Sequence, residues 1–222
     1  MNKWTLIVPA GGVGSRIGAN RPKQYLEIAG HPILIYTLKA LDKHFNQPKF
    51  IIAMATEWVE YLAPFLKDAG LHDRCTIVEG GKERYDSVKN ALQKVTTPWV
   101  GVHDAVRPFV SKQTIERLCE SIVNHAAVIP VIELTESLRH KTSSGTEAVD
   151  RALFMKVQTP QCFHLEHLHA AYEHPFNQTV TDDARLVEQT GVTIHTVSGN
   201  AENIKITTPT DLMLATHLLT TQ

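Results

Sequence analysis

The chain has 222 residues, of which 43% are hydrophobic and 20% charged, as is usual for a globular protein that buries one large core. Lys and Arg number 22 against 23 Asp and Glu, and this balance argues against a chain that binds nucleic acid over its whole surface. The 12 glycines and 11 prolines are too few for a collagenous or low-complexity chain. We therefore expect one domain over residues 1–222.

The cysteines and the apolar runs indicate the compartment. Cys75, Cys119 and Cys162 are far apart and form no CxxC motif, so we expect neither a disulfide framework nor a cysteine zinc site. No apolar run approaches the roughly 18 residues that cross a bilayer. The apolar stretch that follows Lys3 is too short for a secretory signal. These features favour a cytoplasmic protein without a membrane partner.

Short β-branched runs alternate with longer helical patterns over the first 131 residues. Strands are predicted at 6–8, 50–54, 76–78, 99–102 and 126–131. Helices are predicted at 33–41, 57–68, 87–92 and 115–123. Such alternation requires crossover connections. It predicts an α/β, Rossmann-like fold, with a mainly parallel sheet and helices on both faces.

The alternation stops at about residues 132–151, where the pattern is strand, turn, strand. A hairpin of this kind cannot bury a core of its own. We therefore expect 132–151 to be a protruding β-hairpin arm that packs on a second copy of the chain. After the arm, the pattern predicts a strand near Val157, helices at 165–172 and 182–189, a strand at 192–197 and a last helix from Pro209.

The strongest local signal is the glycine-rich segment 10–18, which directly follows the first predicted strand. Consecutive N–H groups in such a loop form an anion-binding concavity. The dinucleotide fingerprint G-x-G-x-x-G is not met, because the spacing here is Gly12-x-Gly14-x-x-x-Gly18. No Gly-Lys-Ser/Thr follows either, so the Walker pattern also fails.

Cations stand beside these glycines, namely Arg16, Arg21 and Lys23. Fixed cations suit a nucleoside triphosphate, whose charge must be neutralised while a second anion attacks. The plain alternative is a glycine turn with solvated basic side chains.

Further motifs follow in order: Gly80-Gly81-Lys82-Glu83-Arg84-x-x-Ser87, His103-Asp104-Ala105-Val106-Arg107-Pro108, Val149-Asp150-Arg151, Thr159-Pro160-Gln161, Thr181-Asp182-Asp183 and Asn203-Ile204-Lys205-Ile206-Thr207. With the glycine loop, they resemble the nucleotidyltransferases that join a nucleoside triphosphate to a sugar or polyol phosphate. Within that family the chain is most similar to the 2-C-methyl-D-erythritol 4-phosphate cytidylyltransferases of the non-mevalonate isoprenoid pathway. The resemblance spans nearly the whole chain.

The resemblance implies transfer of CMP from CTP to 2-C-methyl-D-erythritol 4-phosphate, giving 4-CDP-2-C-methyl-D-erythritol and pyrophosphate. It implies that Arg16 and Lys23 stabilise charge on the α-phosphate, and that Mg²⁺ is held mainly by the CTP phosphates, with no side chain assigned as a metal ligand. The positions matched to the nucleotide are Ala10, Gly11, Gly12, Gly14, Gly81, Lys82, Ser87, Asp104, Ala105 and Lys205. Those matched to the polyol phosphate are Asp104, Arg107, Ser137, Arg151, Thr159, Thr181 and Lys205.

The arm has a special place in this resemblance. Ser137 and Arg151 lie on it, so in a homodimer they would enter the partner's site. Asp150 is expected to position Arg151, and Asp182 and Asp183 to cap a helix. Elementary chemistry agrees with the assignment of cations, because the attacking phosphate is already anionic and needs no general base. The obstacle is repulsion between two polyanions, and rigidly held cations remove it.

Three positions depart from the family pattern. The loop has Gly11 where alanine is common, Ser137 replaces the usual threonine, and Lys82 stands where an acidic residue is expected near the base. The preference for cytosine therefore rests on the resemblance.

Three alternatives stay open. A ribitol-5-phosphate cytidylyltransferase shares most of the motifs, although Val149-Asp150-Arg151 favours methylerythritol phosphate. An NAD(P)-dependent oxidoreductase conflicts with the glycine spacing. A non-catalytic nucleotide-binding module predicts loss of the cations, whereas Arg16 and Lys23 are both present.

Overall fold

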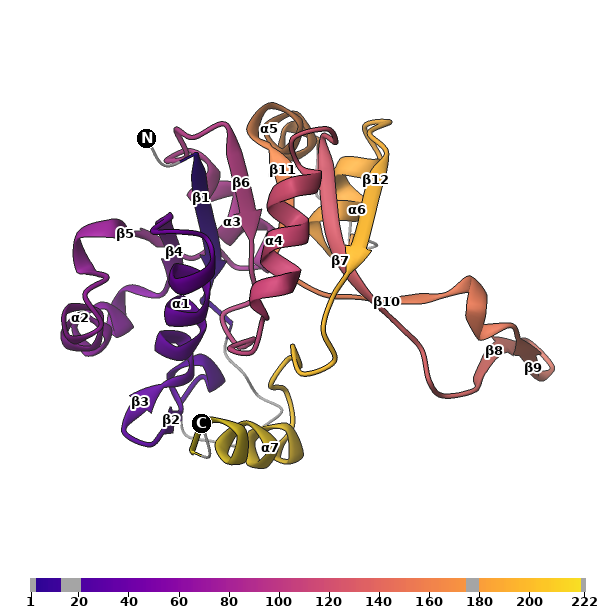
Figure 1. The fold of residues 1–222 in the computed structure, drawn as a ribbon, viewed down its shortest axis with the longest axis horizontal. Coiled ribbons are helices and arrows are strands. Elements are labelled where there is room, and N and C mark those ends of the chain that lie inside the picture. The colour runs from indigo at the N-terminus through magenta and orange to yellow at the C-terminus, as the bar shows by residue number, and fades with distance from the viewer. Residues whose placement is uncertain (1–2, 13–20, 175–179, 221–222) are drawn as a thin grey trace.

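The computed structural model describes residues 3–12, 21–174 and 180–220 (Figure 1). Within these residues lies an eight-stranded sheet with the order β10-β7-β11-β6-β1-β4-β5, and β12 joins it by pairing with β7. The strands are β1 (Trp4–Pro9), β4 (Lys49–Met54), β5 (Cys75–Glu79), β6 (Trp99–Val102), β7 (Ala127–Glu133), β10 (Met155–Val157), β11 (Gln161–His164) and β12 (Ile194–Ser198).

One half of the sheet is parallel. Strand β1 pairs in parallel with β4 and β6, and β4 with β5, so Ile7 lies beside Ile51 on one side and Val102 on the other. Nearly all residues of β1 and β4 are buried, which explains their continuous apolar runs. The predicted fold class, a mainly parallel α/β sheet, is confirmed.

The other half is mixed. Strand β11 runs antiparallel between β6 and β7, and β10 is antiparallel to β7. The sequence analysis missed β11, because four residues with polar Gln161 and His164 at the ends show no clear alternation. It also missed a short hairpin of β2 (Glu27–Ile28) and β3 (His31–Pro32). There, Ala29 and Gly30 take positive φ angles, and such turns leave only a weak sequence signal.

Helices cover both faces of the sheet, as predicted. The helices are α1 (Ile33–His44), α2 (Val59–Asp68), α3 (Arg84–Leu92), α4 (Lys112–Ser121), α5 (Leu165–Glu173), α6 (Asp183–Glu188) and α7 (Pro209–Thr220). Helices α1, α2 and α4 pack on the face to which β1 turns Leu6 and Val8. Helices α3, α5 and α6 pack on the opposite face, against Ile7. Helix α7 lies apart from both layers and packs near the β2–β3 hairpin, through Ala215 (Figure 1).

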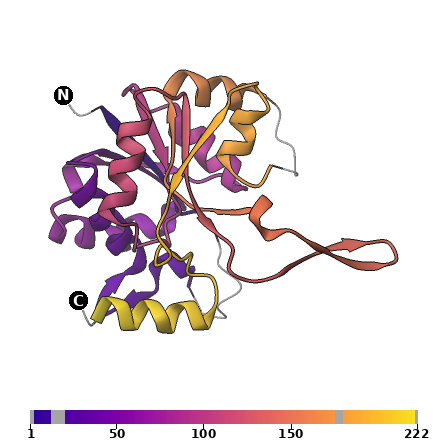
Figure 2. The same ribbon diagram turned by 45° about the vertical axis from the view of Figure 1, so that its right-hand side comes forward.

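The predicted arm is a hairpin of β8 (Leu138–Thr142) and β9 (Gly145–Val149), which pair antiparallel. Strand β7 leads out to it and β10 leads back. Both views show the arm reaching away from the body of the molecule (Figures 1 and 2). Its strand residues are exposed except for the half-buried Leu138 and Val149. The arm therefore contributes little to the core of its own chain.

Candidate active site

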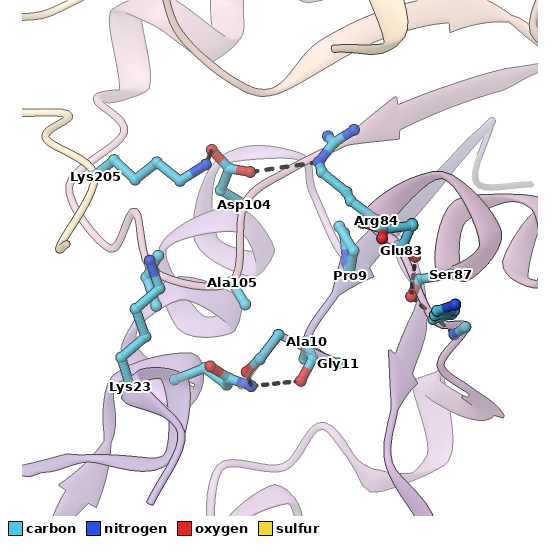
Figure 3. Close-up of a pocket in the computed structure, with 15 residues that line it drawn as sticks. Pro9, Ala10, Gly11, Lys23, Glu83, Arg84, Ser87, Asp104, Ala105 and Lys205 are labelled. Carbon is cyan, nitrogen blue, oxygen red and sulfur yellow. Dashed lines mark hydrogen bonds and ion pairs between the residues drawn. The ribbon is translucent and has the colours of Figure 1, made fainter. Parts of the chain in front are cut away.

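A cavity of about 430 Å³ opens at the carboxyl ends of β1, β5 and β6. This edge is where open parallel sheets bind ligands. The cavity is lined by Pro9, Ala10, Gly11, Gly12, Lys23, Gln24, Gly81, Lys82, Glu83, Arg84, Ser87, Asp104, Ala105, Val106 and Lys205 (Figure 3). The structure thus brings together the predicted residues of four motifs that are far apart in the sequence.

The start of the glycine loop is fixed by a short 3₁₀ turn, η2 (Lys23–Tyr25). The buried Gln24 amide donates through Nε2 to the carbonyl oxygens of Ala10 at 2.6 Å and Gly12 at 2.9 Å. The Tyr25 hydroxyl donates to the same Ala10 oxygen at 3.1 Å. These bonds hold η2, and with it the half-buried Lys23, against the loop that leaves β1. Two other predicted site residues, Gly14 and Arg16, lie outside the described residues.

The loop between β5 and α3 forms the next wall. Gly81 donates its N–H to Ser87 Oγ at 3.0 Å, and Ser87 Oγ donates to the Glu83 carbonyl at 3.1 Å. A Cβ on Gly81 would lie 2.0 Å from Cβ of Asp86, so a side chain cannot be accommodated there without moving the helix. The buried Ser87 hydroxyl therefore shapes the loop, whereas Lys82 is exposed. Their contact with the base stays a prediction.

Asp104 lies at the centre of a cationic cluster. Its Oδ2 accepts from Arg107 Nε at 3.0 Å and lies 3.1 Å from Lys205 Nζ, and its Oδ1 lies 3.8 Å from Arg84 Nε. Burial acts to raise the pKa of this carboxyl group, but the charges of Lys205, Arg84 and Arg107 outweigh it and hold the pKa below its usual range. Asp104 is therefore ionised in the folded protein.

Lys205 reaches this cluster from the segment between β12 and α7. The next residue, Ile206, donates its N–H to the Val106 carbonyl at 3.0 Å and so ties the segment to the loop after β6. The Lys205 side chain remains 40% exposed, so its ammonium group can contact both Asp104 and a ligand. Figure 3 shows Lys23 and Lys205 entering the cavity from two different segments.

Two predicted site residues lie behind Asp104 rather than on the cavity wall. Arg107 is buried and donates through Nη1 to the Asn203 carbonyl at 2.8 Å. Thr159 Oγ1 accepts from the Asp104 N–H at 3.2 Å and lies 3.1 Å from His103 Nδ1. Neither lines the cavity. Both fix the position of Asp104, and their contact with a polyol phosphate stays a prediction.

Other predicted site residues are exposed and lie away from the cavity lining. Thr181 precedes α6. The N-cap of this helix is Asp182, as the sequence predicted, and Asp182 Oδ1 accepts from Arg185 N at 3.0 Å. Ser137 and Arg151 lie on the arm. Arg151 Nη1 donates to the Thr135 carbonyl within the arm.

Asp150 lies directly before Arg151, which it is expected to position. Its carboxylate accepts from Ala152 N at 3.0 Å and caps the short turn η5 (Arg151–Leu153), which begins at Arg151. An aspartate that starts a helical turn satisfies a free N–H group, and this local bond is made here.

Sequence reasoning gave no role in the site to Gln24, Arg84 or Asp183. Arg84 Nη2 lies 2.7 Å from Asp183 Oδ2, and Arg84 lines the cavity. A usable signal existed for Arg84, because an arginine that follows a glycine turn and opens a helix sits at the unfavourable end of the helix dipole. Asp183 pairs with Arg84 across 99 residues, and Gln24 binds backbone carbonyl oxygens, so no local pattern indicates either of them.

The carboxylates of the cavity suit a magnesium ion that arrives with a triphosphate. The described residues hold no group of three or more His, Cys, Asp or Glu side chains that could bind a metal ion. Arg84 Nε lies 3.8 Å from Asp104 Oδ1, beyond hydrogen-bond distance, so this oxygen can still accept from a ligand. Mg²⁺ retains waters and takes one or two carboxylates together with substrate phosphates. A single carboxylate oxygen therefore fits such an ion.

Among the described helices, none combines the length and the hydropathy that a membrane span requires.

The chain is similar to known proteins over nearly its full length. A family model described as 2-C-methyl-D-erythritol 4-phosphate cytidylyltransferase matches residues 4–221. A protein of that name from Bacteroides thetaiotaomicron is 43% identical over 218 residues, which cover 98% of this chain and all (100%) of the relative. Another from Porphyromonas gingivalis is 41% identical over 220 residues, which cover 98% of each chain.

Solved structures give the same result. The 4-diphosphocytidyl-2C-methyl-D-erythritol synthase from Anaerococcus prevotii superposes with a TM-score of 0.84 at 25% identity, covering 98% of this chain and 96% of the other. The 2-C-methyl-D-erythritol 4-phosphate cytidylyltransferase from Thermus thermophilus superposes with a TM-score of 0.79 at 28% identity, covering 96% and 98%.

Proposed function

The chain belongs to the 2-C-methyl-D-erythritol 4-phosphate cytidylyltransferase family and acts as a nucleotidyltransferase of isoprenoid biosynthesis, transferring CMP from CTP to 2-C-methyl-D-erythritol 4-phosphate, and from this premise we propose how its residues perform the transfer. The observation that carries the proposal is the cluster of Arg84, Arg107 and Lys205 around the buried Asp104. Asp104, Arg84 and Lys205 line the same cavity as Lys23.

The reaction is a displacement at phosphorus. A phosphate oxygen of the polyol phosphate forms a bond to the α-phosphorus of CTP, the bond from this phosphorus to the bridging oxygen breaks, and pyrophosphate leaves with that oxygen. The attacking oxygen is already anionic, so no base has to remove a proton. The barrier comes from bringing two polyanions together, and positive groups held in place before the reaction lower it.

CTP occupies the side of the cavity formed by the glycine loop and the β5–α3 loop. The Gly11 N–H faces the phosphates, because Gln24 binds the Ala10 carbonyl of the same peptide on its other side. Gly12, which also lines the cavity, lets the backbone approach the phosphates. The loop of Gly81 and Ser87 takes the base. Lys23, together with Arg16 from outside the described residues, stabilises the charge that develops on the α-phosphate.

The polyol phosphate takes the side near Lys205. The Lys205 ammonium has three donors, and Asp104 Oδ2 at 3.1 Å engages one of them, so the others can bind phosphate oxygens. Asp104 serves as a fixed anion that holds Lys205 and Arg107 in place until the phosphates arrive.

Asp104 Oδ1 would also hold a magnesium ion, directly or through water, on the CTP side of the cavity. When bound to the phosphates of CTP, Mg²⁺ supplies Lewis-acid stabilisation of the charge on the leaving pyrophosphate. The ionised state of Asp104 suits this role, since its pKa is held below the usual range.

A second copy of the chain completes the site in this proposal. Leu153, Phe154, Met155 and Val157, which lead back from the arm, are all exposed, and their side chains need a partner surface. The arms cross in the homodimer, and Ser137 and Arg151 of each enter the site of the other. Arg151 suits this role because its guanidinium binds phosphate through two parallel hydrogen bonds.

We also place the enzyme in the cytoplasm. Cys75, Cys119 and Cys162 are free thiols in the structure, as expected in a reducing compartment.

The experiment that tests the function measures pyrophosphate release with CTP and Mg²⁺. It compares 2-C-methyl-D-erythritol 4-phosphate with ribitol 5-phosphate as acceptor. We expect release with the first acceptor only, and roughly a 10²- to 10³-fold lower kcat in Lys23→Gln. Thermal unfolding of the variant serves as the folding control. Release with ribitol 5-phosphate alone, or an unchanged kcat in Lys23→Gln, would contradict the proposal.

A further inference from the structure

Arg84 occupies a position that is unfavourable for a cation. It is the first residue of α3, after the N-cap Glu83. The N-terminus of a helix carries a partial positive charge, and acidic residues are stabilising there. Arg84 is also largely withdrawn from water, with 31% of its side chain exposed. A plain surface role would not account for an arginine in this place.

Two carboxylates from distant parts of the chain hold the guanidinium. Nη2 donates to Asp183 Oδ2 at 2.7 Å, and Nε lies 3.8 Å from Asp104 Oδ1. Burial acts to lower the pKa of Arg84, but Asp183 and Asp104 outweigh it and raise the pKa. The guanidinium is thus permanently charged and bridges two anions.

Asp183 is itself fixed on its other side. It is the first residue of α6, its carboxylate is buried, and its Oδ1 accepts a hydrogen bond of 2.6 Å from the Tyr172 hydroxyl. With Arg84 on Oδ2, both oxygens are engaged. A buried carboxylate in this arrangement moves only if its partners move with it.

The bridge joins the wall of the cavity to the start of α6. Arg84 lines the cavity and belongs to the same loop and helix as Gly81 and Ser87, on the CTP side. Asp183 lies outside the cavity lining, two residues after Thr181, which the resemblance assigns to the polyol phosphate. Asp104 lies between them, and Figure 3 shows Arg84 and Lys205 approaching its carboxylate from opposite directions.

We propose that Arg84 is a positioning residue that couples the two substrate sites. Through Asp183 it ties the start of α3 to the start of α6, and through Asp104 it fixes the carboxylate that holds Lys205. CTP, by binding against the loop before α3, thereby prepares the side of the cavity that takes the polyol phosphate. The inference rests on the proposed function and adds a thermodynamic coupling between the two substrates.

The coupling is measured as a ratio of affinities. Binding of 2-C-methyl-D-erythritol 4-phosphate is titrated calorimetrically, with and without a CTP analogue whose α,β-bridging oxygen is replaced by methylene. We expect the analogue to tighten binding of the polyol phosphate in the wild type by roughly 5-fold or more, within the usual range of coupling between sites. By reciprocity, the polyol phosphate tightens binding of the analogue by the same factor.

Arg84→Lys keeps the charge but replaces the planar fork with a point charge, which cannot hold both carboxylates in the same geometry. We expect the affinity ratio to fall to about 1, by the loss of coupling between sites. In steady state, we expect KM for the polyol phosphate to rise roughly 10-fold, while KM for CTP measured at low polyol phosphate changes by less than about 3-fold.

A second variant and a control remove the ambiguity of a folding defect. Asp183→Asn keeps hydrogen-bonding capacity toward Tyr172 but removes the charge, so it should reproduce the loss of coupling. The double variant, Asp183→Asn with Arg84→Lys, should lose little more coupling than either single variant, because both substitutions break the same bridge. Arg74→Lys is the matched control: Arg74 also binds an aspartate, Asp42, through Nη2 at 2.9 Å, but it does not line the cavity.

An unchanged affinity ratio in folded Arg84→Lys or Asp183→Asn overturns the inference. So does a variant whose melting temperature falls while the ratio and both KM values stay as in the wild type, because the role of the bridge would then be structural. A wild-type enzyme without transfer to 2-C-methyl-D-erythritol 4-phosphate would overturn the proposed function, and the inference with it. Normal transfer without coupling overturns the inference alone.

Discussion

The cavity and the arm differ in how their charged groups are satisfied. Around Asp104, cations from α3, the loop after β6 and the segment before α7 meet inside one chain. On the arm, the polar contacts are local and exposed, such as Arg139 with Thr146 and His140 with Glu147. One region is therefore organised by contacts between distant parts of the chain, whereas the other is held by contacts within its own hairpin.

This difference follows from what each region has to do. Cations that stabilise a transition state must be held before the reaction, and this requires burial and a network of partners. In the proposed homodimer, the arm must expose its side chains before association. Substitutions in the cavity should therefore change both stability and activity, while those on the arm should change activity only through the dimer.

The largest effect is expected from Gln24→Glu, which keeps the shape of the side chain. The Gln24 amide donates to two carbonyl oxygens, of Ala10 and Gly12, and a carboxylate would face both of them as a buried acceptor. Unmade buried hydrogen bonds cost about 1–3 kcal/mol each, so kcat/KM for CTP should fall by roughly 10²-fold or more. Steady-state kinetics at several pH values measures this effect.

Acidification provides an internal check on that variant. Protonation of the introduced carboxylate restores one donor, so part of the lost activity should return as the pH falls, relative to the wild type at the same pH. Gln93→Glu, at an exposed position at the end of α3, is the control for the added charge. Equal activity of Gln24→Glu and Gln93→Glu would show that the clamp on the glycine loop is dispensable.

The arm is tested by mixing two variants that are each impaired in activity. Arg151→Ala should lower kcat/KM for the polyol phosphate by roughly 10- to 100-fold, the usual worth of a hydrogen bond between charged groups. Its thermal midpoint should not change, because Arg151 is exposed. If the arm acts on the partner, subunit exchange with Lys23→Gln should restore about a quarter of the wild-type activity, since half of the dimers are mixed and each of these has one intact site.

Failure of the mixture to regain activity would show that Arg151 serves the site of its own chain or none. Arg139→Ala is the matched control on the arm, since Arg139 bonds only to Thr146 in the described structure. It should leave the turnover of the dimer unchanged.

A third prediction concerns the pH dependence of stability on the cavity side. His103 is fully buried, and burial lowers its pKa from 6.5 to about 4. As the pH falls, the unfolded chain takes up a proton at His103 near pH 6.5, whereas the folded protein resists protonation down to about pH 4. The contribution of His103 to the free energy of unfolding is therefore fully present above pH 6.5 and is lost on acidification. The loss between pH 7 and pH 5 is about 2 kcal/mol.

Urea unfolding of the wild type and His103→Gln at both pH values isolates this contribution. Between pH 7 and pH 5, the free energy of unfolding of the variant should fall by about 2 kcal/mol less than that of the wild type. His169→Gln, at an exposed position, should lose as much as the wild type. Identical losses in the wild type and His103→Gln would contradict the buried neutral state of His103.

The same contrast explains how much could be predicted from the sequence. The parallel half of the sheet and the loops at its carboxyl edge were predictable, because buried strands and glycine turns each have a recognisable pattern of consecutive residues. The arm was predictable from an interrupted alternation. Arg84 and Asp183 were not, because they pair across 99 residues of the chain. Gln24 was not either, because its bonds to the carbonyl oxygens of Ala10 and Gly12 depend on how η2 folds back on the loop after β1. Arg107 and Thr159 were found by motif, but their inward orientation depends on packing around Asp104.

The smallest effect is expected on the arm, at the pair of His140 and Glu147. Nδ1 of His140 lies 2.9 Å from Oε1 of Glu147, and both side chains are more than half exposed, at 63% and 61%. Exposed ion pairs contribute little because water screens them, so Glu147→Gln should change the free energy of unfolding by less than about 0.5 kcal/mol. Neither acceptor KM nor kcat should change, since this pair lies on the hairpin strands and away from Arg151. A loss of more than about 1 kcal/mol, measured by urea unfolding at several protein concentrations, would mean that the hairpin is buried against another surface at Glu147. The arm would then be as firmly organised by its contacts as the cavity is.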